Sequence, residues 1–423
     1  MAASVQGNLL VDQAVDQVDR DRLVSLTIDL TNIPSPTGEE GEIARAYLDT
    51  LSDAGLTTTL QAIGDDRYNA VGILEGQGGG KSLMFNGHLD TSFGNDFADR
   101  GPGFKTEGQL LDDQWIFGMG TFNMKSSLAA YIVAVEAIRA AGIQLGGDLI
   151  IAGVAGEIEK APVEDFDGPN YQGYGVGSKH LVTHGGVAEA CIIGEPTNMK
   201  LVAAHCGSSW VKINIPGKLV HTAWSDPKDN AILKSRKILD GIDQWTVDYQ
   251  NRNSIGNFSP KVNVAAIDGG WAWRGARAPD SCSIYIDIRT LPEVMPIQIL
   301  KEIRSVVNEI NSENPDIGAT TKLYVSNPGT SIPDDHDLVR HINAAHSAEL
   351  GHPAELSMEV WCSDAMHINR YGVPSVNYGA AGRIREGGEG WSTQQGEHVH
   401  IGDLVDITKV YVRVILAWCG IAT

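Results

Sequence analysis

Residues suited to metal-assisted chemistry stand in four short motifs. His88 and Asp90 lie two apart in Gly87-His-Leu-Asp-Thr91. At the end of a strand both point to one side, so Asp90 is expected to hold the second ring nitrogen of a metal-bound His88. A loop histidine with ordinary hydrogen bonds is the alternative. Asn123 lies in a glycine-rich turn that matches no phosphate-binding loop, and a helix N-cap is its plain interpretation.

Carboxylates occupy the other two motifs. Glu157 and Glu159 follow the apolar run 149–154, and Glu195 stands before Pro196 after another apolar run. At the buried end of a strand a glutamate has a raised pKa, which suits a general base beside a metal-activated water. A solvated loop explains each motif alone. Together, four strand ends that offer His, Asn, Glu and Glu indicate one site.

These motifs require a sheet that brings its strand ends together. Short apolar runs at 82–85, 149–154 and 189–193 alternate with stretches of helical spacing, the longest at 124–141. This order predicts an α/β domain with a mostly parallel sheet, whose ligands bind beyond the carboxyl ends of the strands. Nearer the N-terminus, Thr37 and Glu40 are expected to cap a helix.

The pattern changes after Gly207. Alternating runs at 209–215 and 283–288, with helical spacing at 230–246 and 296–310, predict a separate α+β module. The α/β character returns near Ser326. The sequence therefore predicts three segments: 1–207 and 326–423 form the larger domain, and 208–325 is inserted into it.

Composition limits the class of protein. The 423 residues include 32 Lys or Arg and 53 Asp or Glu, so the net charge is 32 − 53 = −21. With 42% hydrophobic residues the chain folds into sizeable cores. The acidic excess argues against nucleic acid or an anionic membrane as a partner. The first twenty residues do not resemble a signal peptide, no apolar run is long enough to span a bilayer, and five scattered cysteines favour the cytoplasm.

The ordered motifs GHLDT, GMGTFNMK, GEIE, GEPT, KLVHTA and EHVHIGD resemble a metal-dependent deacylase and exopeptidase family. That family includes acetylornithine deacetylase, succinyl-diaminopimelate desuccinylase, aminoacylase and glutamate carboxypeptidase. The resemblance implies a zinc-peptidase-like α/β catalytic domain, an inserted α+β lid and dimerisation domain, a homodimer, and usually two metals bridged by an Asp.

The resemblance also implies roles for individual residues. His88, Glu195 and His400 match metal ligands, with His398 the alternative to His400, and Asp90 matches the carboxylate that orients His88. Glu157 matches the general base. His221 matches a histidine that reaches the partner subunit's active site. Arg289 is the candidate for gripping a substrate carboxylate, and a structural Asp–Arg pair is the alternative.

Two departures from the family pattern change the expected chemistry. Asn123 stands where the family has the bridging Asp, and Ile158 stands where a second Glu ligand follows the base. We therefore expect one divalent metal, Mn²⁺ or Zn²⁺, held by His88, Glu195 and Asn123. His400 would be nearly the only ligand at the second metal position, unless Glu159 replaces the missing glutamate there.

The expected reaction is hydrolysis of a C–N bond in a small carboxylate-bearing substrate. The altered ligands, and Trp271 and Trp273 in the insert, favour the aryl-amine branch that resembles 5-nitroanthranilate aminohydrolase, which forms 5-nitrosalicylate and ammonia. Packing in a core or an interface is the alternative for the two tryptophans. The alternatives are a two-zinc amino-acid deacylase or dipeptidase, and a catalytically inactive binding or scaffold relative.

Overall fold

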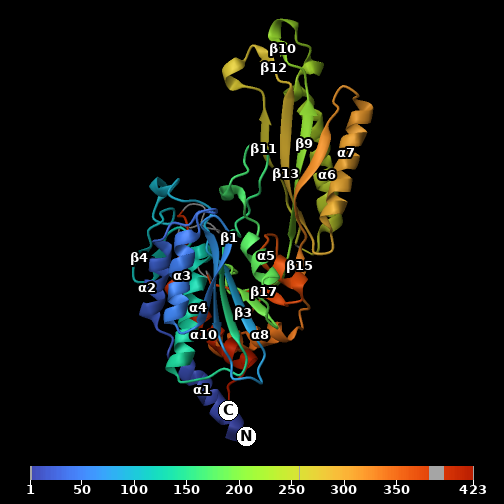
Figure 1. Ribbon diagram of the computed structural model, residues 1–423. Coiled ribbons are helices and arrows are strands. Elements are labelled where there is room, and N and C mark those ends of the chain that lie inside the picture. The colour runs from blue at the N-terminus through green and yellow to red at the C-terminus, as the bar shows by residue number, and fades with distance from the viewer. Residues whose placement is uncertain (1, 257, 381–394, 423) are drawn as a thin grey trace. The chain divides into compact units, whose positions relative to one another are not determined.

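The computed structural model describes residues 2–256, 258–380 and 395–422 and contains two compact units (Figure 1). The first unit is built from Met1–Ala203, Ile332–Ser357 and Ser363–Thr423, and the second from Ala204–Ser331 and Met358–Cys362. The expected insert, 208–325, lies inside the second unit. Residues Met358–Cys362 belong there as well, and the N–H of Cys206 donates to the carbonyl of Glu359 at 2.9 Å.

The first unit is organised around a mixed sheet. Its strands follow the order β1-β2-β6-β3-β7-β17-β8, and the short β15 (Thr330–Ser331) and β16 (Leu356–Glu359) pair with β8. The central strands β6, β3, β7 and β17 are parallel neighbours, whereas the β1–β2, β2–β6 and β17–β8 pairs are antiparallel. The strands are β1 (Thr57–Gly64), β2 (Arg67–Leu74), β3 (Leu83–His88), β6 (Leu149–Val154), β7 (Cys191–Ile193), β8 (Leu201–His205) and β17 (Ser375–Asn377).

Helices cover both faces of this sheet, which explains why β3 and β6 are fully buried and why β6 and the first half of β3 are apolar. Leu83 and Phe85 of β3 face a core formed with one set of helices, and Met84 faces a second core on the opposite side. The first core uses α1 (Ala2–Val15), α2 (Arg20–Thr31), α3 (Gly41–Asp53), α4 (Ser126–Ala140), α8 (Asp337–Leu350) and α10 (Ile401–Cys419); the second uses α5 (Val176–Thr183) and α9 (Ala365–Ile368).

A small antiparallel sheet holds the segment that leads into α10. Its order is β18-β5-β4, from β18 (His398–His400), β5 (Trp115–Phe117) and β4 (Gln109–Leu111). His398 pairs with Phe117. Residues near 397 therefore lie beside the glycine-rich turn that follows β5.

The second unit is a four-stranded antiparallel sheet in the order β11-β13-β9-β14. Alternate residues such as Ile213 and Ile286 face a core shared with Ile242 and Ile303 of the helices. The elements are β9 (Gly207–Pro216), β11 (Val262–Gly269), β13 (Ser281–Thr290), β14 (Thr320–Asn327), α6 (Ala231–Asn253) and α7 (Pro296–Glu313), with a two-stranded pair of β10 (Val220–His221) and β12 (Arg277–Ala278).

No helix in the described part of the chain combines the length and the apolar character needed to cross a bilayer.

Candidate active site

Three of the predicted residues meet at the carboxyl ends of neighbouring parallel strands. His88 ends β3, Glu157 follows β6, and Glu195 follows β7. Nε2 of His88 lies 3.9 Å from Oε2 of Glu157 and 3.9 Å from Oε1 of Glu195. The three side chains are buried, and one ligand atom from each lies within 4.8 Å of the others. Within residues 2–256, 258–380 and 395–422 no other His, Cys, Asp and Glu side chains converge in this way.

His88 has an acceptor at each ring nitrogen. Nδ1 lies 2.8 Å from the carbonyl oxygen of Asp90, and Nε2 lies 2.9 Å from Oδ1 of Asn123. A neutral imidazole carries one N–H and satisfies only one of these oxygens. Both contacts can be satisfied by a second proton on the ring, by an Asn123 amide turned so that its NH₂ donates to Nε2, or by a cation between Nε2 and the amide oxygen.

Asn123 is not the N-cap of the following helix. It lies in a one-turn π-helix, η2 (Thr121–Lys125), where its φ of −126° and ψ of 89° are not helical. The preceding Gly120 has φ +88°, and a Cβ there would lie 2.8 Å from Cγ2 of Thr91, so the turn requires glycine. This irregular turn directs the Asn123 side chain towards His88.

The carboxylate of Asp90 forms hydrogen bonds with the backbone at Glu157 and not with the His88 ring. Its oxygens accept the backbone N–H groups of Glu157 at 2.9 Å and Ile158 at 3.1 Å, and the hydroxyl of Thr37 at 2.8 Å. Oδ1 lies 3.6 Å from Nδ1 of His88, so the backbone carbonyl of Asp90, and not its side chain, makes the hydrogen bond expected with His88. Asp90 thus fixes the turn that carries Glu157.

A buried ion pair supports the same turn. Arg67 donates to both oxygens of Glu40 at 2.7 Å, and neither side chain is more than 3% exposed. Gly156 has φ +66°, and a Cβ there would lie 2.5 Å from Nη2 of Arg67. The capping predicted for Thr37 and Glu40 is wrong: Thr37 donates to Asp90, and Glu40 makes no side-chain cap.

Two functional candidates were missed from the sequence. Oδ2 of Asp364 accepts the hydroxyl of Ser178 at 2.6 Å, and its buried Oδ1 has no partner in the described part of the chain. Oε2 of Glu397 accepts the N–H groups of Gly120 at 2.9 Å and Asn123 at 3.1 Å. Neither residue has a distinctive sequence signal. Asp364 lies in a Ser-Asp-Ala pattern typical of an ordinary helix cap, and Glu397 precedes His398 and His400, which are the more obvious metal ligands.

The cluster is short of positive charge. Burial and the neighbouring carboxylates Glu195 and Asp364 raise the pKa of Glu157 well above its ordinary value. Burial likewise raises the pKa of Glu195 and that of Asp364. Burial alone would lower the pKa of His88, but the charges of Glu195 and Asp90 outweigh it and raise that pKa. The buried Oε1 of Glu195 also has no hydrogen-bond partner among the described residues.

This donor set fits a divalent cation. An imidazole nitrogen, a carboxylate oxygen without a partner and an amide oxygen meet, and all three are ligands that Zn²⁺ or Mn²⁺ accepts. Excess negative charge at the same point favours the cation further.

The late histidines do not join this cluster. Nδ1 of His400 accepts the N–H of Asp403 at 3.2 Å, so His400 caps α10. His398 is buried with its ring stacked on Phe117 at 4.7 Å. Glu159 is half-buried and is also outside the converging group. The metal role of His400 remains a prediction.

The other predicted residues lie in the second unit. Nδ1 of His221 accepts the N–H of Ala223 at 3.1 Å. Arg289 forms an ion pair with Asp287 at 2.9 Å and donates to Sγ of Cys362 at 3.4 Å, which is the structural pair named as the alternative. Trp271 and Trp273 are 40% and 79% exposed, so neither is a core residue of this unit.

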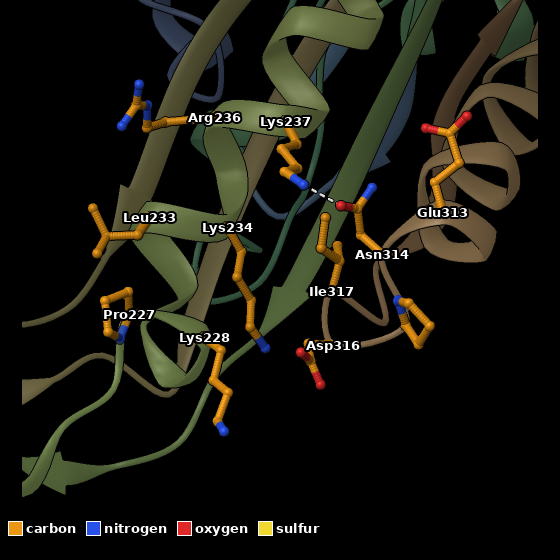
Figure 2. A pocket seen from close by; sticks show the side chains of 11 residues that line it. Pro227, Lys228, Leu233, Lys234, Arg236, Lys237, Glu313, Asn314, Asp316 and Ile317 are labelled. Carbon is orange, nitrogen blue, oxygen red and sulfur yellow. Dashed lines mark hydrogen bonds between the residues drawn. The ribbon is translucent and has the colours of Figure 1, made fainter.

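The second unit also contains a hollow of about 490 Å³ between the start of α6 and the segment after α7 (Figure 2). Lys228, Lys234, Arg236 and Lys237 line it together with Glu313 and Asp316. The ammonium group of Lys237 donates a hydrogen bond to the side-chain oxygen of Asn314, and Lys234 donates to the carbonyl of Pro216 at 2.8 Å. None of the predicted catalytic residues lines this hollow.

The fold and the cluster define a class of protein: an α/β domain with a candidate metal centre at its strand ends, joined in one chain to a separate α+β unit. The chain belongs to peptidase family M20/M25/M40, whose model matches residues 84–417. It is therefore a metal-dependent hydrolase, and the family resemblance inferred from the motifs is confirmed.

Similar proteins include several hydrolases. N-formyl-4-amino-5-aminomethyl-2-methylpyrimidine deformylase of Halalkalibacterium halodurans is 22% identical over 97% of this chain and 98% of that protein. Succinyl-diaminopimelate desuccinylase of Cereibacter sphaeroides is 24% identical over 93% of this chain and 97% of that protein. The crystal structure of human carnosine dipeptidase 1 has a TM-score of 0.74 at 14% identity, covering 97% of this chain and 99% of that one.

Proposed function

We propose that the chain uses one divalent metal to hydrolyse a C–N bond in a small carboxylate-bearing substrate. His88, Glu195 and the side-chain oxygen of Asn123 would hold the metal. The observation that carries this proposal is the convergence of His88, Glu157 and Glu195, with the buried Oε1 of Glu195 left without a partner among the described residues.

The mechanism divides the work between the metal and Glu157. A bound divalent metal would lower the pKa of water and polarise the group under attack. Glu157, whose pKa is raised by burial and by nearby carboxylates, accepts a proton from water and returns it to the leaving nitrogen. Asp90 keeps Glu157 in place through two backbone N–H groups.

We infer one metal, and not two, from the ligand set. Two carboxylates that would accompany a second cation are absent, because positions 123 and 158 are Asn and Ile. Nitrogen and oxygen donors without a thiolate suit Mn²⁺ as well as Zn²⁺.

The leading substrate class is an N-acylated amine or amino acid. The relatives above are named as a deformylase and a desuccinylase, and amide hydrolysis requires only the groups gathered at the cluster. An aryl amine, as in 5-nitroanthranilate, is the second candidate. The exposed indoles of Trp271 and Trp273 favour it, because such surfaces stack on flat rings.

We further propose that the enzyme is a cytoplasmic homodimer in which His221 of one subunit reaches the partner subunit's active site and Arg289 contacts the substrate carboxylate. Five buried cysteines, all free, agree with a reducing compartment. Mixing Glu157→Gln and His221→Ala proteins tests the crossing: hybrid dimers should regain activity that neither parent has.

Metal analysis combined with a substrate screen tests the proposed function. We expect about one equivalent of Mn²⁺ or Zn²⁺ per chain, and release of an acyl group or ammonia when N-acyl amino acids are compared with aminobenzoates. Glu157→Gln should lower kcat by about 10²–10⁴-fold, whereas the matched control Glu159→Gln should not. Two equivalents of metal would favour the dinuclear deacylase, and absence of metal binding would favour the inactive relative.

A further inference from the structure

Glu397 places a carboxylate behind the turn that carries Asn123. Its Oε2 accepts the N–H of Gly120 at 2.9 Å and that of Asn123 at 3.1 Å. The residue as a whole is half-buried, but burial of the carboxylate raises its pKa to about 7, even though these N–H groups oppose the rise. Burying a carboxylate costs free energy unless hydrogen bonds or an opposite charge compensate it.

The turn is irregular at the residue that Glu397 contacts. Asn123 and Met124 have non-helical backbone angles, and the N–H of Asn123 donates to Glu397. The turn itself is closed by the N–H of Lys125, which donates to the carbonyl of Gly120 at 2.7 Å. Glu397 is therefore the side chain that binds both ends of the loop from Gly120 to Asn123.

Glu397 is itself anchored on both sides. Its N–H donates to the carbonyl of Gly103 at 2.8 Å, and its carbonyl accepts the N–H of Gly118 at 3.2 Å. The next residue, His398, enters the pairing of β18 with β5. Because the backbone of Glu397 is held on both sides, its side chain can fix the position of the turn that it contacts.

The consequence reaches the metal centre through one side chain. The amide oxygen of Asn123 lies 2.9 Å from Nε2 of His88, on the side of the ring where the proposed metal binds. A neutral amide is a weaker ligand than the aspartate of the family pattern, so its contribution depends on accurate placement.

We propose that Glu397 is a positioning residue, which holds the turn from Gly120 to Asn123 so that the Asn123 oxygen faces His88, and which thereby sets the affinity of the site for a divalent metal. This inference rests on the proposed function. It assigns Glu397 no contact with the substrate or with the reacting atoms.

Metal titration of the parent chain and three variants tests the proposal. The full-length chain is stripped with a chelator and titrated with Mn²⁺ or Co²⁺. We expect Glu397→Ala to weaken binding about 10–100-fold. Glu397→Gln keeps an oxygen within reach of both N–H groups and should bind within about 5-fold of the parent, whereas Glu397→Asp keeps the charge but loses the reach and should resemble Glu397→Ala.

A double-mutant cycle shows whether Glu397 acts through Asn123. If it does, adding Glu397→Gln or Glu397→Ala to Asn123→Ala causes no further loss of affinity, and the Co²⁺ visible spectrum of Glu397→Ala shifts in the same direction as that of Asn123→Ala. Thermal unfolding of the metal-free proteins checks that each variant is folded, and Glu397→Gln and Glu397→Asp carry the test if Glu397→Ala is not.

Three results would overturn the inference: unchanged affinity in Glu397→Ala, additive losses in the cycle, or a loss in Glu397→Gln that Glu397→Asp does not share. The last result would show that the negative charge of Glu397, and not its hydrogen bonds to the turn, sets the metal affinity. If the parent chain itself bound no metal, the proposed function would fail together with this inference, whereas a parent that binds metal beside an unaffected Glu397→Ala would remove the inference alone.

Discussion

Replacing Asp90 with Asn separates two roles that one carboxylate could have. In the folded chain the oxygens of Asp90 accept from Glu157 N, Ile158 N and the hydroxyl of Thr37, while His88 Nδ1 bonds to the Asp90 carbonyl. We therefore expect Asp90→Asn to disturb Glu157 and to leave the orientation of His88 nearly unchanged.

The size of the effect follows from counting donors. The N–H groups of Glu157 and Ile158 bond to different oxygens of Asp90, so an Asn side chain, with one oxygen in their place, keeps only one of these two bonds. Thr37 can rotate its hydroxyl to accept from the new NH₂ group. One buried N–H then faces a donor, and the loss of one hydrogen bond to a charged group costs roughly 1.5–3 kcal/mol. With weakening of the bond that remains, we expect about 2–4 kcal/mol of destabilisation.

Three measurements on one protein test this expectation. Chemical unfolding should show the loss of stability, and a displacement of Glu157 of about 1 Å should lower kcat roughly 10²-fold. Metal affinity should change less than about 5-fold, because the support of His88 comes from the backbone. Thr37→Val, which removes one donor and leaves both amide bonds, is the matched control and should retain most of the activity.

The opposite pattern would refute the argument. If Asp90→Asn lost about 10–100-fold in metal affinity but kept its turnover at saturating metal, the carboxylate would serve His88, as the motif alone predicts. Stability equal to that of the parent would show that the three hydrogen bonds contribute little.

Three further predictions concern stability and the late histidine. Arg67→Met leaves the fully buried Glu40 without its partner and should cost about 3–5 kcal/mol in urea unfolding; adding Glu40→Gln should recover part of the loss. Burial lowers the pKa of His205 to about 4, so the unfolded chain binds the extra proton between pH 6.5 and 4. Stability should fall by up to roughly 3 kcal/mol as the pH drops through that window, and His205→Phe should flatten this slope; an equal slope in both proteins would exclude His205. His400→Ala should lose about 1 kcal/mol as a lost cap with unchanged metal content, and a loss of metal would instead make His400 a ligand.

Elements buried on all sides were predictable from periodicity. The apolar run 149–154 is the strand Leu149–Val154, and the predicted helix 124–141 is Ser126–Ala140. Periodicity does not reveal strand β1, because Thr57–Gly64 begins with three threonines and contains no fully buried residue, so it carries little apolar signal.

The sequence predicts those site residues that directly follow an apolar strand. His88, Glu157 and Glu195 each follow an apolar run, and parallel strands bring such ends together. The contacts from Thr37 to Asp90 and from Glu397 to Asn123 join parts of the chain that lie far apart in sequence. Spacing contains no signal for such contacts, so the supports of the site required the fold.

The two departures from the family pattern act together on the charge of the centre. Glu157, Glu195 and Asp364 already bring three buried carboxyl groups near one imidazole, and burial raises the pKa of each carboxyl. One dication offsets about two negative charges and returns these groups towards their ordinary pKa values. An aspartate at 123 and a glutamate at 158 would add two more negative charges, which a second dication would have to offset. Asn123 and Ile158 lack both charges, so the single metal that we propose would be enough to balance the centre.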